Sequence, residues 1–276
     1  MVGPKIFKIY EFTWLLSKAK RWKLQEGKIY EGLPALISNA TLKDDDINHH
    51  HRPQSQEEAV EAVRKDMKNL CDLVAQSLEE REISCRIFHP HTFMKGNDSS
   101  FEADVEAIFE AIHHDEHSDN KRVIPILHGD VVEVSGTAKF GILSGDHIAE
   151  RLVLESFRRN KNPESGDTGK IWQKIHMVFA MTDVPGLMSH PPGHPDSVLI
   201  PKWNPDHSNS ILLDKTRLKH NSNIDVTGGI ALKLDVASKM TEFTDNIWIL
   251  DGRQPHRIIE AVMDASTEGT LISRHL

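Results

Sequence analysis

Hydrophobic residues recur at helical spacing directly after a long N-terminal stretch without any pattern. Ser55 and Glu58 precede the run at the spacing of a capping box, in which each side chain satisfies a backbone N–H group of the other. Steps of three and four residues place the apolar side chains on one face of a helix. The pattern therefore predicts an amphipathic helix over residues 55–80. Its apolar face consists of Val60, Val63, Met67, Leu70, Val74 and Leu78.

Short apolar runs and further helical patterns alternate along the rest of the chain. Strands are predicted over residues 83–88, 123–127, 138–143, 174–180, 247–250 and 270–272. Helices are predicted over residues 100–113, 146–157 and 255–263. A Gly-Gly turn followed by a helix is predicted within residues 224–240, and residues 189–221 are predicted to be mostly loop. Strands that alternate with helices in this order are typical of a layered α/β fold with a largely parallel sheet.

Composition and charge narrow the class of protein. The chain of 276 residues is 38% hydrophobic and has a formal net charge of -8. No apolar run is long enough to cross a membrane, and the acidic balance disfavours a nucleic-acid partner. Two cysteines, Cys71 and Cys85, form no disulfide framework, so a cytoplasmic location is expected. His49–His51 beside Asp44–Asp46 could ligate a metal ion, but a solvated loop is the favoured interpretation.

Four polar turns lie where predicted strands end or predicted helices begin. They are His-Gly-Asp at 128–130, Ser-Gly-Asp at 144–146, Thr-Asp-Val-Pro-Gly at 182–186 and Asp-Val-Thr-Gly-Gly at 225–229. Ligands of open α/β sheets bind at such strand ends, where glycine lets backbone N–H groups approach an anion. Each turn alone is better explained as an ordinary turn or helix cap. Together with Lys233, one turn inside the last helix, they predict a phosphoryl-transfer site.

The segments around these turns also carry a family resemblance. In order along the chain they read IPILHGDVV, GILSGDHIAERL, TDVPGL with a downstream PPGHPDSVLI, DVTGGIALK, and IWILDGRQPHRIIEAVMDASTEGTLI. Neither a Walker A loop nor a GxGxxG fingerprint is present. With these segments, residues 56–276 resemble the amino acid kinase superfamily and, within it, the isopentenyl phosphate kinases.

This resemblance implies a fold and an activity. The fold would be a three-layer αβα sandwich with a largely parallel central sheet. Residues 1–54 would be a poorly defined segment, and residues 55–276 the kinase-like domain, with an acceptor side over about 55–158 and a nucleotide side over about 170–276. The activity would be ATP-dependent phosphorylation of isopentenyl phosphate, with Mg²⁺ accompanying ATP. The superfamily often forms dimers, so a homodimer is compatible with it.

The resemblance also assigns roles to residues. Asp146 would organise the catalytic lysines, and Lys233 would stabilise charge during transfer. The acceptor would be bound at Gly129, Asp130 and Gly145. The residues implied to bind ATP are Thr182, Asp183, Gly186, Gly228, Gly229 and Lys233.

The N-terminal stretch departs from the family. Residues 1–55 contain neither its Lys-Leu-Gly-Gly-Ser-like turn nor its Gly-x-Gly-Ser-Phe-Gly-His-like motif, so an N-terminal strand and part of the active site are expected to be missing. Pro185 stands where the family usually has Asp, a minor change. Three interpretations stay open: a kinase of this family whose gene model is truncated, a family member without catalysis that acts as a binding or regulatory module, and a sister small-molecule kinase.

Overall fold

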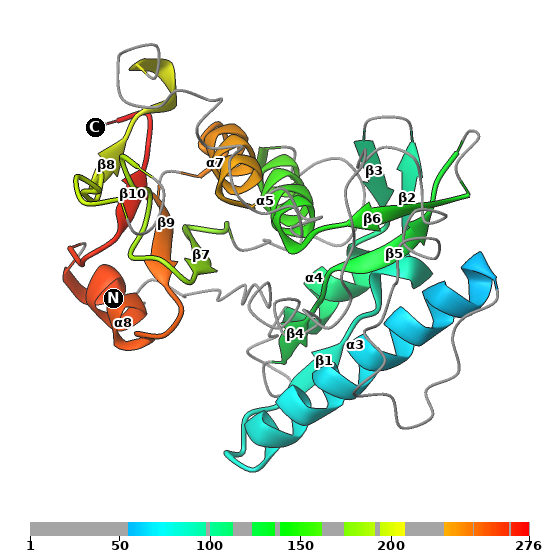
Figure 1. Ribbon diagram of the computed structural model, residues 1–276. Coiled ribbons are helices and arrows are strands. Elements are labelled where there is room, and N and C mark those ends of the chain that lie inside the picture. Colours follow the sequence, from blue (N-terminus) through cyan, green and yellow to red (C-terminus); the bar gives the residue numbers. More distant parts are fainter. Residues whose placement is uncertain are drawn as a thin grey trace, which may run out of the picture. The chain divides into compact units, whose positions relative to one another are not determined.

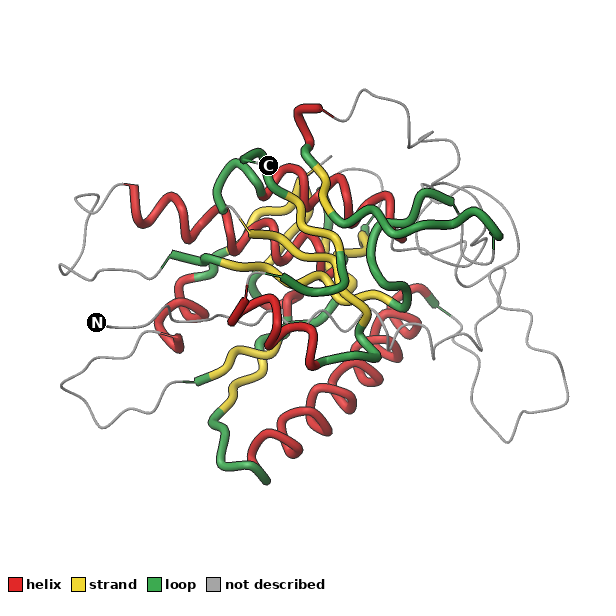
Figure 2. The backbone as a smooth tube through the Cα atoms, turned by 90° about the vertical axis from the view of Figure 1, so that its left-hand side faces the viewer, coloured by secondary structure: helices red, strands yellow, loops and turns green. Residues whose placement is uncertain are grey.

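The computed structural model describes residues 55–97, 100–112, 123–135, 139–161, 174–190, 194–207, 229–244, 246–264 and 266–275. Within them, residues 55–148 group into one compact unit, here called the N-terminal unit, and residues 149–275 into a second, the C-terminal unit. Helices and strands are both plentiful (Figure 2). The predicted α/β class is therefore confirmed, whereas the predicted disposition of residues 1–54 and of His49–His51 lies outside the described residues.

The N-terminal unit is built on the long helix α3 (Gln56–Glu79), which lies beside β1, β4 and β5 (Figure 1). β1 (Cys85–Ile87) pairs in parallel with β4 (Ile124–Ile126). The short helices η3 (Pro90–Thr92) and α4 (Glu106–Ile112) belong to the same unit. α3 buries Val60 against Val131 and Phe140. The predicted apolar face is thus used only in part, because Val63 on the same helix is 39% exposed.

Two antiparallel ribbons complete this unit. β2 (Met94–Asn97) pairs with β3 (Ser100–Ala103), and β5 (Asp130–Glu133) pairs with β6 (Phe140–Leu143). A bridge between Gly96 and Val134 links the ribbons. A side-chain Cβ at position 96 would meet Val134 Cγ1 at 2.4 Å, so the close approach requires glycine there.

The predicted helix over residues 100–113 is wrong in its first half. Residues 100–103 form strand β3, and the helix α4 begins only at Glu106. Phe101 happens to fall at helical spacing from Val105 and Ile108, so the periodicity counted a strand residue as part of the helix face. The antiparallel ribbons also make this unit less parallel than the alternation of elements suggested.

The C-terminal unit contains a four-stranded sheet in the order β7-β9-β10-β8. β7 (Met177–Thr182) and β9 (Asn246–Asp251) are parallel, β10 (Thr270–Ile272) is antiparallel to β9, and β8 (Lys202–Trp203) is parallel to β10. The helices are α5 (Gly145–Lys161), which begins in the N-terminal unit, α7 (Gly229–Met240), α8 (His256–Asp264) and the short η4 (Pro205–His207).

The core of this sheet lies between β7, β9 and α8. Apolar strand residues and one face of α8 pack together there, since a strand buried in an α/β sheet reads as a continuous apolar run. No helix among the described residues has the length and apolar character to cross a membrane. The core cluster comprises Phe179, Trp248, Leu250, Ile258 and Ala261.

Candidate functional site

The two Gly-Asp turns lie at the same end of the β5–β6 ribbon. Asp130 is the first residue of β5, and its register partner is Leu143, the last residue of β6. Gly129 therefore enters the ribbon at the end where Ser144 and Gly145 leave it. The sequence separates the two turns by sixteen residues, but antiparallel pairing brings them together.

Helix α5 begins in the Ser-Gly-Asp turn at residues 144–146. Ser144 caps it: its hydroxyl accepts a hydrogen bond from the backbone N–H of His147 at 3.3 Å, and its carbonyl accepts from Ile148 at 3.3 Å. Asp146 lies in the first turn, where a carboxylate complements the helix dipole, and it is buried. The first turn of a helix also presents backbone N–H groups that favour an anion. Gly145 thus lies at a helix N-terminus, and its predicted contact with an acceptor stays a prediction.

The carboxylate of Asp130, in the His-Gly-Asp turn, accepts hydrogen bonds from within the protein. The side chain of Asp130 is fully buried. Its Oδ2 accepts hydrogen bonds from the backbone N–H of His91 at 2.9 Å and from His91 Nδ1 at 2.8 Å, while Oδ1 accepts from the backbone N–H of Val131 at 2.8 Å. Asp130 therefore orients an imidazole, and its predicted contact with an acceptor stays a prediction.

Two further histidines adjoin this pair. His128 Nδ1 lies 2.8 Å from the carbonyl oxygen of Gly129, and its Nε2 lies 2.9 Å from His89 Nδ1. The rings of His89 and His91 are stacked with centroids 5.9 Å apart. Burial lowers the pKa of His89, and the neighbouring His128 and His91 lower it further. Three imidazoles and one buried carboxylate thus form a polar cluster within the N-terminal unit.

The predicted nucleotide turn follows β7 in the C-terminal unit. Thr182 ends β7, and its register partner Asp251 ends the parallel strand β9. The backbone N–H of Gly252 donates to the carbonyl of Thr182 at 2.7 Å, which holds the two strand ends together. Asp183 follows Thr182 at this edge, and its charge contributes, after that of Asp251, to raising the pKa of Arg253. Thr182 and Asp183 therefore lie at a strand edge of the kind that binds ligands.

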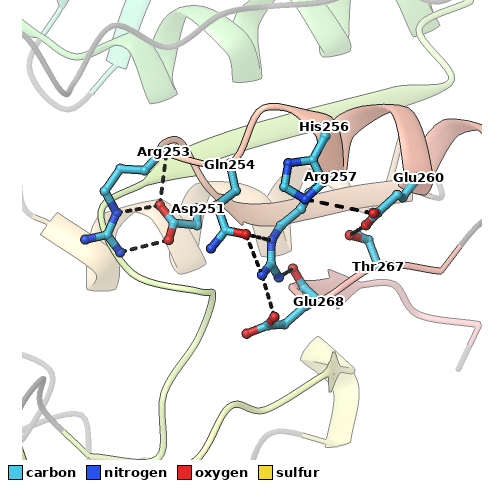
Figure 3. Close-up of polar contacts among 8 residues, drawn as sticks. All are labelled: Asp251, Arg253, Gln254, His256, Arg257, Glu260, Thr267 and Glu268. Atoms are coloured by element: carbon cyan, nitrogen blue, oxygen red, sulfur yellow. Dashed lines mark hydrogen bonds and ion pairs between the residues drawn. The ribbon is translucent and has the colours of Figure 1, made fainter.

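A polar network runs from this edge along α8 (Figure 3). Arg253 Nε and Nη2 donate to the two carboxylate oxygens of Asp251, each at 2.8 Å, so the pair is bidentate. The Asp251 side chain is 3% exposed and that of Arg253 is 58% exposed. The side chain of Arg253 lowers the pKa of Asp251 by hydrogen bonding. Further along, Arg257 donates to Gln254 and to Glu268.

Gly186 has a packing role that accounts for its glycine. A Cβ at this position would meet Thr270 Oγ1 at 2.6 Å and Leu199 Cδ1 at 2.8 Å. The buried Thr270 hydroxyl accepts from the backbone N–H of Leu187 at 2.8 Å and donates to the carbonyl of Ile200 at 2.6 Å. Gly186 thus lets the turn close onto β10, and its predicted contact with ATP stays a prediction.

The last predicted turn leads into α7. Gly229 begins this helix, Lys233 lies one turn inside it and is buried, and Gly228 lies outside the described residues. Asp146 belongs to the N-terminal unit and Lys233 to the C-terminal unit. The structure thus groups the acceptor-side residues in one unit and the described nucleotide-side residues in the other.

Sequence reasoning missed His89 and His91 as site candidates, and it assigned no role to Asp251. The available signals were the His-Pro-His tripeptide directly after a short strand and the Asp-Gly-Arg turn after an apolar one. No three His, Cys, Asp or Glu side chains of the described chain are grouped so that they could hold a metal ion.

Taken together, the described elements define a mixed α/β protein with polar turns at its strand ends. Neither a protein-family model nor a curated protein sequence matches the chain. Several solved structures, however, match the chain. A structure of isopentenyl phosphate kinase aligns over 79% of this chain and 71% of its own, with 20% identity and a TM-score of 0.56. The particular fold is therefore that of the isopentenyl phosphate kinases, which confirms the predicted resemblance at the level of fold.

Two further structures agree. An isopentenyl phosphate kinase in complex with substrate aligns over 80% of this chain and 73% of its own, with 20% identity and a TM-score of 0.54. The product complex of the isopentenyl phosphate kinase from T. acidophilum aligns over 79% and 72%, with 19% identity and a TM-score of 0.53.

Proposed function

We propose that the chain is a small-molecule kinase that transfers the γ-phosphoryl group of ATP to a phosphate monoester, isopentenyl phosphate. The observation that carries the proposal is the meeting of the two Gly-Asp turns at one end of the β5–β6 ribbon. One of these turns opens α5, and phosphates favour the N-terminus of a helix. Gly129, Asp130 and Gly145 would thus bind the acceptor, and Asp146 would orient lysines.

The nucleotide side of the proposal rests on the C-terminal unit. Thr182, Asp183 and Gly186 would line the ATP pocket, and Gly229 with Lys233 would contact its phosphates. Positioning and charge neutralisation do most of the catalysis in phosphoryl transfer, so a buried lysine near the start of a helix suits this role. Mg²⁺ is usually held by substrate phosphates and one or two carboxylates.

Substitution of Lys233 tests the activity. Lys233→Met keeps the length of the side chain and removes its charge. We expect ADP release in the presence of isopentenyl phosphate to fall by about 100-fold, the usual effect of losing one group that stabilises transition-state charge. The matched control is Lys239→Met on the same helix, since Lys239 is half exposed and pairs with Asp235. Circular dichroism checks that both variants fold.

Three results would separate the alternatives. Turnover with another phosphate monoester or a carboxylate, but not with isopentenyl phosphate, would favour a sister kinase. Binding of ATP without any ADP release would favour a non-catalytic binding or regulatory module. Absence of turnover, combined with an ATP affinity that Lys233→Met leaves unchanged, would refute the kinase proposal.

The layered architecture and the two sides of the domain belong to the same proposal. We infer a three-layer αβα arrangement in which residues 55–158 form the acceptor side and residues 170–276 the nucleotide side. A cytoplasmic homodimer would suit such an enzyme. Size-exclusion chromatography with light scattering measures the oligomeric state directly.

A further inference from the structure

We propose that His89 and His91 form a binding site for a tetrahedral oxyanion of the phosphate type, and that binding is coupled to uptake of a proton by the protein. His128 and the buried Asp130 hold the two rings in place. The resemblance assigned no role to either histidine. The further claim that this oxyanion is the phosphate of the acceptor rests on the proposed function. The existence of the oxyanion site itself can be tested without ATP.

The hydrogen-bond partners fix the tautomers of the rings. The carbonyl oxygen of Gly129 only accepts, so His128 Nδ1 carries a proton. The Nε2 of a neutral His128 then accepts from His89 Nδ1. In the same way the carboxylate of Asp130 accepts from His91 Nδ1. Both His89 and His91 are therefore held by Nδ1, and each neutral ring keeps a lone pair on Nε2.

These two Nε2 atoms are the open positions of the cluster. Among the described residues neither has a hydrogen-bond partner, and the His91 side chain is 25% exposed. The stacked rings turn their Nδ1 edges toward His128 and Asp130, so their opposite edges face away from those buried partners. A lone pair that takes up a proton becomes a charged donor, and two such donors suit one tetrahedral oxyanion.

Nearby charges favour an anion over a metal ion. Arg64 on α3 donates from Nη2 to the carbonyl of Val131 at 3.0 Å, next to Asp130. Lys68 on the same helix lowers the pKa of His89, after burial and the neighbouring histidines. These cations, which are ion-paired with the exposed Glu61 and Asp72, repel a divalent metal ion to the extent that their charge reaches the cluster. Asp130 opposes them, but its oxygens already accept three hydrogen bonds from within the protein.

Proton uptake follows from the electrostatics of His89 and its surroundings. Burial and like-charged neighbours lower its pKa, so the free protein holds this ring neutral near pH 7. A bound dianion favours the charged form of an imidazole. Cys71 on α3 also faces Asp130, but burial raises its pKa to about 11, so the thiol stays protonated and exchanges no proton here.

Calorimetry with sulfate tests the proposal, because sulfate is a tetrahedral dianion that does not itself titrate near neutral pH. Binding to the full chain at pH 7.5 is measured in two buffers with different heats of ionisation, which reveals any proton taken up. We expect the wild type to bind sulfate with proton uptake. His91→Gln keeps an amide N–H for Asp130 and should weaken binding by about tenfold, because it removes one charge-assisted hydrogen bond.

The controls separate the site from the fold and from catalysis. His256→Gln is matched to His91→Gln, since His256 also neighbours a carboxylate, Glu260 at 3.9 Å, but is 61% exposed on α8. It should leave sulfate binding unchanged. Circular dichroism checks folding, and His89→Gln provides a second variant of the cluster. Competition by isopentenyl phosphate, with loss of that competition in His91→Gln, identifies the oxyanion as the acceptor's phosphate.

Several outcomes would overturn the inference. Sulfate binding without a dependence on buffer would remove proton coupling, and binding that survives both His89→Gln and His91→Gln would place the anion elsewhere. Tight binding of Zn²⁺ in place of sulfate would make the cluster a metal site instead. Each of these can occur while ADP release is retained, so failure here is distinct from failure of the proposed kinase activity.

Discussion

Asp130 and Asp251 carry almost wholly buried carboxylates, and both are satisfied by neighbouring side chains and backbone. Asp130 holds an imidazole, and Asp251 holds the guanidinium of Arg253. Burying a carboxylate is costly unless it accepts hydrogen bonds, and each of these accepts three. The sequence identified Asp130 through its Gly-Asp turn. For Asp251 the signal was the Asp-Gly-Arg turn after an apolar run, to which no role was assigned; its partner Arg253 lies two residues away.

The Asp251–Arg253 pair predicts a pH-dependent stability. Asp251→Asn should lower the free energy of unfolding at pH 7 by about 1–3 kcal/mol, because charge-assisted hydrogen bonds are lost. The folded-state pKa of Asp251 is lowered, so its contribution is present above about pH 4 and disappears as the pH falls through that folded-state value. Urea unfolding at pH 7 and pH 3 measures the difference between wild type and variant.

A matched comparison uses an exposed pair. Asp235→Asn removes a carboxylate that lies 2.9 Å from Lys239 on the surface of α7. Exposed pairs contribute little, so this change should stay within about 0.5 kcal/mol. An Asp251→Asn effect that is equally small, or that persists undiminished at pH 3, would contradict the role of the buried pair.

At the scale of elements, long periodic segments and short apolar runs such as β4 and β10 were predictable, whereas the ribbon strands β2, β3 and β5 were not. The helix now called α3 was predicted within a residue of its ends, because its apolar positions recur over more than five turns. Strand β5 holds only four residues and follows a turn, so its pattern carried no strand signal. The β2–β3 ribbon was missed because Phe101 mimicked a helix face. The two Gly-Asp turns were expected to be adjacent at one site, but the β5–β6 pairing that brings them together could not be derived from the sequence.

The N-cap of α3 gives an element-scale prediction. Ser55 Oγ accepts from the backbone N–H of Glu58 at 3.1 Å, which is one half of the predicted capping box. Ser55→Ala should lower stability by about 1 kcal/mol, and Ser55→Asp should restore it, because aspartate is an equally good N-cap. Thermal unfolding measures both. Equal stability of the alanine and wild-type proteins would mean that the cap contributes nothing to the start of α3.

At the scale of the whole molecule, each compact unit has a core of its own. Val132 is completely buried in the N-terminal unit, and Ile249 is completely buried in the C-terminal unit. The predicted division near residues 158–170 came from the family resemblance. It had no access to the pairing of strands, on which each core depends.

Because the two units have separate cores, a cavity made in one core should reduce the protection of backbone amides from hydrogen exchange mainly in that unit. Ile249→Ala should destabilise by about 2–4 kcal/mol, and Val132→Ala by a somewhat smaller amount, because each leaves a cavity. Hydrogen exchange followed by mass spectrometry should then show faster exchange mainly in the unit that carries the substitution. Equal acceleration in both units after either change would mean that they unfold as one cooperative structure.

The register of the β5–β6 ribbon has a consequence for insertions and deletions. Asp130 faces Leu143 at one end, whereas Val134 donates to the carbonyl of Lys139 toward the other end. Residues added between Val134 and Lys139 lengthen the connection without moving either Gly-Asp turn. Deleting a single residue within β5 or β6 would instead shift the alternation by one and turn Val131 or Phe140 away from Val60. This chain can therefore vary in length at one end of the ribbon while the relative position of its two Gly-Asp turns is kept at the other.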